Sequence, residues 1–327
     1  MLPGSSRSSD SAFGFLPQVG AEPFPGYQLL RLRGHGGFAT VWESTSPTGE
    51  NVALKFMSSQ NVSTTARELR SLQAIQSIDH PQLLRIRSVW SLPGCIVIGM
   101  DLAEASMLDL LQLYLEDLNR PIEVEKLCWY MVQVADVLDF LNARHHRIDG
   151  RLVGLQHGDI KPNNILLLGD RPMLADYGLA TPTMGPITPC PRHGTAEYCA
   201  PEVFTGNLTE ASDQYSFAVT YYVLRTGAFP FPAPPSDKTK FKLKDYRRPD
   251  PDLTALPDIE RIPLMRALSH IPQQRFTSCS EFMLSILTSL RLQAIRTDDG
   301  ELRIEPASVD SGSGFKTKSN LGSKWVI

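Results

Sequence analysis

The stretch 155–167, LQHGDIKPNNILL, places charged and amide side chains between apolar anchors. Asp159 is a candidate proton acceptor, and Lys161, two residues later, is a candidate counter-charge for a phosphate. Asn164, five residues after the aspartate, can offer a carbonyl oxygen to a metal ion. The apolar run at 165–167 predicts a short buried strand that holds this loop from behind.

On its own, such a cluster is also compatible with a solvated turn. A second acidic motif favours a site, because Asp176-Tyr177-Gly178 follows twelve residues after Asn164. That spacing leaves room for two short strands and a turn. The loop and the second aspartate would then converge on one cation.

Together these motifs resemble the catalytic loop and the metal-binding motif of Hanks-type protein kinases, His-Arg-Asp-x-Lys-x-x-Asn and Asp-Phe-Gly. The resemblance is to the serine/threonine branch and to its soluble bacterial members. It implies an α+β, bilobal fold over residues 27–292. The small lobe, at about 27–99, would be an antiparallel sheet with one helix, and the large lobe, at about 104–292, would be mainly helical. Residues 1–26 are expected to be a flexible leader, and the polar residues 293–327 a disordered tail.

A glycine-rich turn between two predicted strands, GHGGFATV at 34–41, lets backbone amides approach phosphates closely. The turn alone could equally be a plain hairpin. It resembles the kinase Gly-x-Gly-x-x-Gly-x-Val loop, with Ala39 replacing the third glycine and Arg33 replacing an aliphatic residue. By the same register Met100 is the gatekeeper. The resemblance implies that ATP is bound by Gly34, Gly36, Gly37, Val41, Ala53, Lys55, Met100, Asp101, Ala103 and Leu166.

Lys55 lies within the apolar strand pattern at 51–56, where its charge would be costly to bury without a partner. Glu68, on a predicted helix over 64–78, stands where the family carries the glutamate that pairs with this lysine. The resemblance implies that Lys55 holds the α- and β-phosphates and that Glu68 holds Lys55. The alternative is a surface glutamate on an amphipathic helix.

The resemblance assigns the remaining chemical roles. Asp159 would accept or orient the proton of the substrate hydroxyl, and Lys161 would steady the γ-phosphoryl group. Asn164 and Asp176 would ligate Mg²⁺, with Mn²⁺ as a possible substitute. The expected substrates are proteins with serine or threonine hydroxyls.

The segment 194–202, GTAEYCAPE, closely matches the family's substrate-docking loop and Ala-Pro-Glu motif. We refer to it below as the docking segment. The resemblance implies that Glu202 pairs with a buried Arg275. It also implies that Asp213 tethers the backbone of the catalytic loop.

The main departure from the family pattern is Gly158, which stands where most members carry arginine. That arginine normally binds a phosphorylated residue of the activation segment. We therefore predict that activity does not require phosphorylation of the segment at 179–192, which contains Thr181, Thr183 and Thr188 and is expected to be mobile.

Several scaffold elements are also predicted. Apolar periodicity indicates a helix over 123–142, and further helical runs are expected at 263–269 and 280–291. The chain at 143–154 is longer than is usual in the family and is expected to be a solvated loop.

Composition sets further limits. The 327 residues, 42% of them hydrophobic, suffice for about one such domain, and the net charge of −3 gives no reason to expect nucleic-acid or membrane binding. Five scattered cysteines without a Cys-x-x-Cys pair indicate a reducing compartment. With no apolar run near the roughly 20 residues of a membrane span, we expect a soluble cytoplasmic protein.

Two other functions remain open. A His-Gly-Asp motif with a downstream asparagine also occurs in small-molecule kinases such as aminoglycoside phosphotransferases, although they lack the Ala-Pro-Glu segment. Alternatively, the departures at Arg33, Ala39 and Gly158 could mark a pseudokinase that acts as a binding scaffold.

Overall fold

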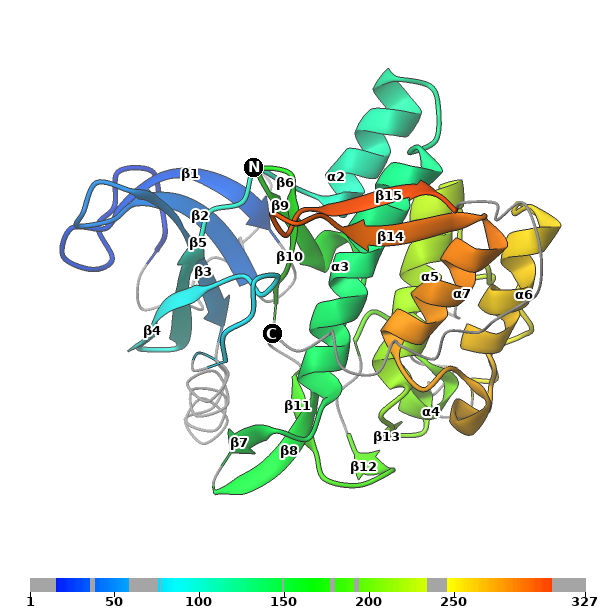
Figure 1. Ribbon diagram of the computed structural model, residues 1–327. Coiled ribbons are helices and arrows are strands. Elements are labelled where there is room, and N and C mark those ends of the chain that lie inside the picture. The colour runs from blue at the N-terminus through cyan, green and yellow to red at the C-terminus, as the bar shows by residue number, and fades with distance from the viewer. Residues whose placement is uncertain are drawn as a thin grey trace, which may run out of the picture.

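The computed structural model describes residues 16–35, 39–58, 76, 78–148, 150–176, 180–190, 194–233 and 246–307. These residues form a small lobe of β-strands and a larger, mainly helical lobe (Figure 1). The predicted α+β, bilobal fold is therefore confirmed. The helix predicted at 64–78 lies almost wholly outside the described residues, and Glu68 with it.

The small lobe is a five-stranded antiparallel sheet in the order β1-β2-β3-β5-β4. Its strands are β1 (Gln28–His35), β2 (Ala39–Thr45), β3 (Asn51–Ser58), β4 (Ile86–Leu92) and β5 (Cys95–Asp101). β3 and β5 are buried along most of their length on both faces of the sheet, and their sequences are correspondingly apolar. Lys55 of β3 pairs in register with Val41 of β2 and Ile98 of β5, which fixes it in the middle of the sheet.

The end of the predicted flexible leader is instead part of this lobe. The Gly20 amide donates to the Leu29 carbonyl over 2.7 Å, and the Leu29 amide donates to the Ala21 carbonyl over 2.9 Å. Phe24 stacks on Trp90 of β4 with ring centroids 4.3 Å apart. The flexibility expected at 16–26 is therefore wrong, because the backbone of Gly20 and Ala21 pairs with the start of β1 and Phe24 packs on Trp90, which is distant in sequence.

The large lobe is built around two buried helices, α3 (Val124–Asn142) and α5 (Ser212–Thr226). The predicted stripe of α3 is buried throughout: Leu127, Met131, Val134, Leu138 and Leu141. Around them lie β6 (Ala105–Ser106), α2 (Met107–Gln112), the π-helix η1 (Leu113–Asp117), α4 (Pro201–Phe204), α6 (Asp258–Ala267), the 3₁₀ turn η5 (Pro272–Gln274) and α7 (Cys279–Ser289). α6 begins five residues before the helical run predicted at 263–269. That run was expected to start at Pro263, but this proline lies inside the helix rather than in its first turn.

The loop that carries Asp159 is held between short strands. It runs from β8 (Arg151–Gln156) to the 3₁₀ turn η2 (Pro162–Asn164) and into β9 (Ile165–Leu168). β9 pairs with β10 (Arg171–Leu174) and with β6. The predicted strand at 165–167 is therefore present, and the hairpin leads directly to Asp176.

The chain at 143–154 is not the solvated loop that we expected. β7 (His146–Ile148) pairs with β8, and β8 also pairs with β11 (Thr181–Thr183), the beginning of the expected mobile segment. Further on, β12 (Thr188–Pro189) pairs with β13 (Asn207–Leu208). Local sequence could not predict β11, β12 and β13, because each obtains its hydrogen bonds from a segment distant in sequence, whereas β7 and β8 are neighbours in the chain.

The expected disordered tail is also partly wrong. Leu292–Arg296 (β14) and Leu302–Pro306 (β15) form an antiparallel hairpin that packs across α3 (Figure 1). The indole N–H of Trp129 donates to the Leu302 carbonyl over 2.8 Å. The Asp299-Gly300 turn between alternating apolar residues was a usable hairpin signal, and Gly300 has a φ of +84°. Residues 308–327 lie outside the described part of the chain.

We predict that removing the hairpin destabilises the large lobe. A chain ending at Arg291 exposes Trp129 and loses the buried side chains of Leu292 and Leu302, each contributing about 1.5–3 kcal/mol. Thermal unfolding should show a melting temperature lower by about 6 °C or more. A chain ending at Ala307 is the control and should melt within about 1 °C of the full chain. Equal melting temperatures for the two truncated chains would contradict the prediction.

Candidate active site

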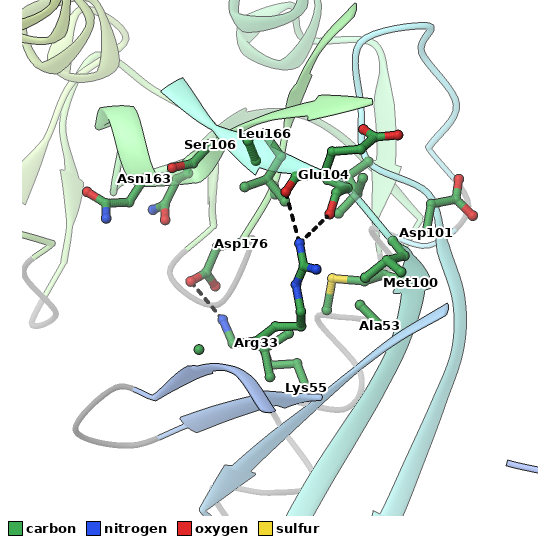
Figure 2. Close-up of a pocket in the computed structure, with 18 of the residues that line it drawn as sticks. Arg33, Ala53, Lys55, Met100, Asp101, Glu104, Ser106, Asn163, Leu166 and Asp176 are labelled. Atoms are coloured by element: carbon green, nitrogen blue, oxygen red, sulfur yellow. Dashed lines mark hydrogen bonds and ion pairs between the residues drawn. The ribbon is translucent and has the colours of Figure 1, made fainter. Parts of the chain in front are cut away.

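A cavity of about 370 Å³ lies between the two lobes (Figure 2). β1, β2 and β3 cover it, β9 and the chain after β10 form its floor, and the chain after β5 closes one end. Of the residues predicted to bind the nucleotide, Gly34, Val41, Ala53, Lys55, Met100, Asp101, Ala103 and Leu166 all line this cavity. Gly36 and Gly37 lie outside the described residues.

An ion pair crosses the cavity from the small lobe to the large lobe. The Nζ atom of Lys55 lies 2.7 Å from Oδ2 of Asp176. Burial acts to raise the pKa of Asp176, but the charge and hydrogen bond of Lys55 outweigh it and hold the pKa below its ordinary value. The carboxylate is thus kept ionised. The predicted pair between Lys55 and Glu68 involves a residue outside the described part of the chain.

The backbone of Asp176 is in an uncommon conformation. Its φ is +68°, in the left-handed region that few residues other than glycine adopt. Such strain persists where surrounding contacts over-determine the conformation and often marks a functional residue. Here it accompanies the ion pair with Lys55.

Asp159 is surrounded by donors. Its Oδ1 accepts from both the amide and the hydroxyl of Thr195 over 2.8 Å, and its Oδ2 lies 2.8 Å from Nζ of Lys161. Lys161 also donates to the Thr195 hydroxyl over 2.6 Å. Burial acts to raise the pKa of Asp159, but the hydrogen bond and charge of Lys161, together with Thr195, lower it overall. The carboxylate is therefore an ionised acceptor at neutral pH.

Asn164 and Asp176 offer oxygen ligands to a cation. The amide nitrogen of Asn164 donates to the Asp159 carbonyl over 2.7 Å and to Oδ2 of Asp159 over 2.9 Å. Because these hydrogen bonds use the amide nitrogen of Asn164, its side-chain carbonyl oxygen is the atom available to bind a cation. An amide oxygen and an ionised carboxylate on the wall of one cavity suit a hard cation such as Mg²⁺.

Asp213 holds the backbone before Asp159 in place, as predicted. Its Oδ2 accepts from the His157 amide over 2.5 Å, and its Oδ1 accepts from the Gly158 amide over 2.9 Å. The ring of His157 accepts from the Asp159 amide at Nδ1 (3.3 Å), so its Nε2 donates to the Ala175 carbonyl (2.8 Å). Burial raises the pKa of Asp213, although His157 and the backbone amides oppose this. Asp213 thus holds the loop before Asp159, and the His157 ring joins that loop to the chain that leads to Asp176.

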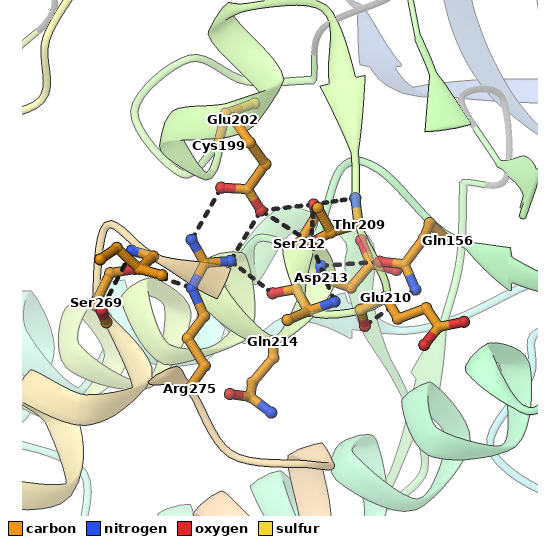
Figure 3. A network of polar contacts seen from close by, with 12 residues as sticks. Gln156, Cys199, Glu202, Thr209, Glu210, Ser212, Asp213, Gln214, Ser269 and Arg275 are labelled. Atoms are coloured by element: carbon orange, nitrogen blue, oxygen red, sulfur yellow. Dashed lines mark hydrogen bonds and ion pairs between the residues drawn. The ribbon is translucent and has the colours of Figure 1, made fainter. Parts of the chain in front are cut away.

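The second predicted tether is also present (Figure 3). Arg275 donates from Nη1 and Nη2 to the two carboxylate oxygens of Glu202, each over 2.8 Å. The Ser212 hydroxyl donates to the same carboxylate over 2.8 Å, and Arg275 also donates to the Ala211 carbonyl over 2.9 Å. The Arg275 side chain is fully buried, so this bidentate pair is shielded from solvent. It fixes the end of the docking segment to α5.

The docking segment touches the Asp159 loop through Gly194. A Cβ atom at this position would lie 2.2 Å from the Gly158 carbonyl oxygen and 2.9 Å from Oδ1 of Asp159. Glycine is therefore needed for the close approach that brings Thr195 to Asp159. Gly158 itself has a φ of +79°, which glycine adopts without strain.

Arg33 gives the cavity a polar edge. Its Nη2 donates to the Glu104 carbonyl over 2.9 Å (Figure 2). Nη2 also donates to the Ala103 carbonyl over 3.3 Å, and Nη1 lies 3.5 Å from Oε2 of Glu43. The sequence predicted a polar residue at this edge of the cavity. It did not predict that the Arg33 side chain would contact the chain after β5. It also missed Ser106 and Asp109, which line the cavity and form a capping box at the start of α2. The Ser-x-x-Asp spacing was a usable signal.

Comparisons with known proteins show what this chain is similar to. Residues 27–291 match a family model described as "Protein kinase domain". A relative from rice (Oryza sativa subsp. japonica), CBL-interacting protein kinase 4, is 34% identical over 225 residues, which cover 64% of this chain and 46% of the rice protein. Serine/threonine-protein kinase PknD of Mycobacterium tuberculosis is 29% identical over 315 residues, covering 89% of this chain and 45% of PknD. The chain thus spans about half the length of these relatives.

A solved structure shows the same fold. The kinase domain of Mycobacterium tuberculosis PknI superimposes with a TM-score of 0.64 and 24% sequence identity, covering 84% of this chain and all of that one. At this identity the likeness concerns the fold alone.

The helices in the described part of this chain are too short or too polar to span a membrane.

We predict that the pair between Glu202 and Arg275 makes stability depend on pH. Burial acts to raise the pKa of Glu202, but Arg275 outweighs it and holds the pKa below its ordinary value. Glu202 therefore stabilises the fold above its unfolded pKa of about 4.3, and this contribution is lost as the pH falls through the lower folded pKa. At pH 7, Glu202→Gln should cost about 3–5 kcal/mol, because it leaves a buried cation without its counter-charge.

Denaturant unfolding between pH 3.5 and pH 7 measures this effect. The difference in unfolding free energy between the native chain and Glu202→Gln should be constant above about pH 5 and shrink below about pH 4.3. The control is Glu301→Gln, because Glu301 forms an exposed pair with Arg303 and should differ by less than about 1 kcal/mol throughout. A Glu202→Gln difference that does not change with pH would contradict the prediction.

Proposed function

This chain belongs to the protein kinase family, and we propose that it transfers the γ-phosphoryl group of ATP to a serine or threonine hydroxyl of a protein. The arrangement of Asp159, Lys161 and Thr195 in one hydrogen-bonded group is the observation that carries the proposal. It joins the proposed acceptor of the substrate proton to the docking segment. The mycobacterial relative PknD is named a serine/threonine-protein kinase, in agreement with this substrate class.

In the proposed reaction the substrate hydroxyl oxygen forms a bond to the γ-phosphorus, and the bond from that phosphorus to the β–γ bridging oxygen breaks. ADP leaves with the bridging oxygen, and the hydroxyl proton passes to the Asp159 carboxylate. Lys161 is placed to balance negative charge on the transferred group, and Lys55 to hold the other phosphates. A Mg²⁺ ion held by Asn164 and Asp176 would supply further neutralisation of the phosphate charge.

The docking segment favours a protein substrate over a small molecule. It is held at one end by Thr195 on Asp159 and at the other by Glu202 on Arg275. A rigid segment beside the proposed catalytic base suits an extended polypeptide. The aminoglycoside phosphotransferases of the alternative hypothesis lack the Ala-Pro-Glu motif that ends this segment.

Phosphate transfer from [γ-³²P]ATP tests the proposal. We expect the chain to label itself or myelin basic protein in the presence of Mg²⁺, and not kanamycin. Asp159→Asn should lower the rate by about 100-fold or more, because it removes the proton acceptor. The matched control is Asp170→Asn, at an exposed position after β9, which should keep the native rate.

Two results would contradict this function. Labelling of kanamycin in preference to protein would favour the small-molecule kinase. Thermal stabilisation by Mg-ATP without any transfer would favour the pseudokinase scaffold.

We also propose that activity does not require phosphorylation of the activation segment. Besides the absence of an arginine at Gly158, the described part of this segment has strand partners on both sides. β11 is held on β8 and β12 on β13, and the Cys190 amide donates to the Gly206 carbonyl over 2.7 Å. Main-chain hydrogen bonds thus supply the order that a phosphate bound by arginine supplies elsewhere.

We predict that the triple variant Thr181→Ala, Thr183→Ala, Thr188→Ala keeps turnover within about threefold of the native rate, since these hydroxyls need no phosphate. Initial rates on myelin basic protein measure this, after phosphatase treatment verified by mass spectrometry. Thr183 is 1% exposed, so the corresponding triple valine variant controls for packing. Loss of turnover in both variants with an unchanged melting temperature would show that phosphorylation is required.

The cysteines support the reducing, cytoplasmic setting that we propose for the chain. The side chains of all five are buried. Burial raises the pKa of Cys95 to about 11 and that of Cys128 to about 12, which disfavours the reactive thiolate. They act as small apolar residues of the core.

A further inference from the structure

A buried arginine that takes no part in the proposed phosphate transfer binds the backbone of the docking segment. Arg248 is 3% exposed and lies on the chain before α6. Its Nη1 donates to the Glu197 carbonyl over 3.1 Å. Its Nη2 donates to the Ala196 carbonyl over 2.6 Å and to the Cys199 carbonyl over 2.9 Å. One guanidinium group therefore binds three carbonyl oxygens within four consecutive residues of the docking segment.

The environment of Arg248 is aromatic. Its Cζ atom lies 4.5 Å from the ring centroid of Phe231, 5.2 Å from that of Phe204 and 5.8 Å from that of Tyr215. Among the described residues no carboxylate forms an ion pair with it. The aromatic ring faces and the carbonyl dipoles therefore stabilise the guanidinium charge in place of a carboxylate. Burying a charge without a counter-ion is energetically unfavourable.

The other buried arginine beneath this segment is arranged differently. Arg275 is neutralised by Glu202, and its Cζ atom lies 4.9 Å from the ring centroid of Tyr215. Tyr215 therefore contacts both arginines. Arg275 holds the end of the docking segment by charge, whereas Arg248 holds its middle by carbonyl groups.

The carbonyls bound by Arg248 lie directly after Thr195. The amides of Tyr198 and Cys199 donate to the Thr195 carbonyl over 3.0 and 3.2 Å, so residues 195–199 form one turn. Thr195 in turn binds Asp159. The shape of the turn held by Arg248 thus sets where a polypeptide on the docking segment would lie relative to Asp159.

We propose that Arg248 is a positioning residue for the protein substrate: it holds the turn 195–199 in the shape that the substrate binds, without taking part in nucleotide binding. Arg248 is not among the residues that line the nucleotide cavity. The substrate part of this inference rests on the proposed kinase function. The part that concerns the shape of the turn does not.

The test compares Arg248→Lys and Arg248→Met with Arg247→Met, a matched change at an exposed neighbouring arginine. Lysine keeps the charge but loses the planar fork of donors, and methionine keeps the apolar stem only. Hydrogen exchange measures the backbone of 194–202 against that of α5. Initial rates give KM for myelin basic protein and, separately, KM for ATP.

We expect exchange at 194–202 to be about tenfold faster or more in both Arg248 variants, with α5 unchanged. KM for myelin basic protein should rise about fivefold or more, while KM for ATP stays within twofold. Arg247→Met should match the native chain in every measurement. If Arg248→Met does not fold, Arg248→Lys decides the outcome.

Native exchange at 194–202 in a folded Arg248 variant would overturn the proposal. So would equal rises in KM for ATP and for the protein, because they indicate general damage. If the native chain transfers no phosphate to protein, the proposed function fails, and the exchange measurement alone still decides whether Arg248 shapes the turn.

Discussion

The contact between Asp159 and the docking segment is the constraint on which the rest of the site depends. One carboxylate accepts the amide and hydroxyl of Thr195 and also pairs with Lys161. This approach is only possible because residue 194 is glycine, since a Cβ atom there would overlap the Gly158 carbonyl. Two segments that are 35 residues apart in the chain, at 159 and 194, thereby form one surface.

The large lobe supports this contact with buried charges, each compensated differently. Asp213 is balanced by two backbone amides, and Arg275 by the bidentate carboxylate of Glu202. Arg248 is balanced by carbonyl oxygens and aromatic faces. A buried charge is unfavourable unless hydrogen bonds and nearby dipoles compensate it, so each group tolerates little movement of the backbone it binds. This restriction of backbone movement helps to keep the geometry of the neighbouring site constant.

The described part of the activation segment, at 180–190, is held in a different way. Its described residues are held by pairing of β11 with β8 and of β12 with β13, rather than by an ion pair at Gly158. Main-chain hydrogen bonds do not depend on a modification, whereas a phosphate bound by arginine does. The extra residues at 143–154 contribute to this arrangement, because they form β7 and lengthen the sheet that receives β11.

The sequence by itself determined the family, the two lobes, the helix at 124–142 and the polar residues around the cavity. These depend on short spacings and on local periodicity, which the chain carries wherever it folds. The pairs of Glu202 with Arg275 and of Asp213 with the catalytic loop were also predictable, but only through the family resemblance. The tertiary structure alone decided the packing of Phe24 on Trp90, the packing of the β14–β15 hairpin on α3, the reach of Arg33 and the contacts of Arg248. Each of these contacts joins residues that are far apart in the sequence. The residues next to a side chain in the sequence do not indicate which distant carbonyl group or ring it will contact.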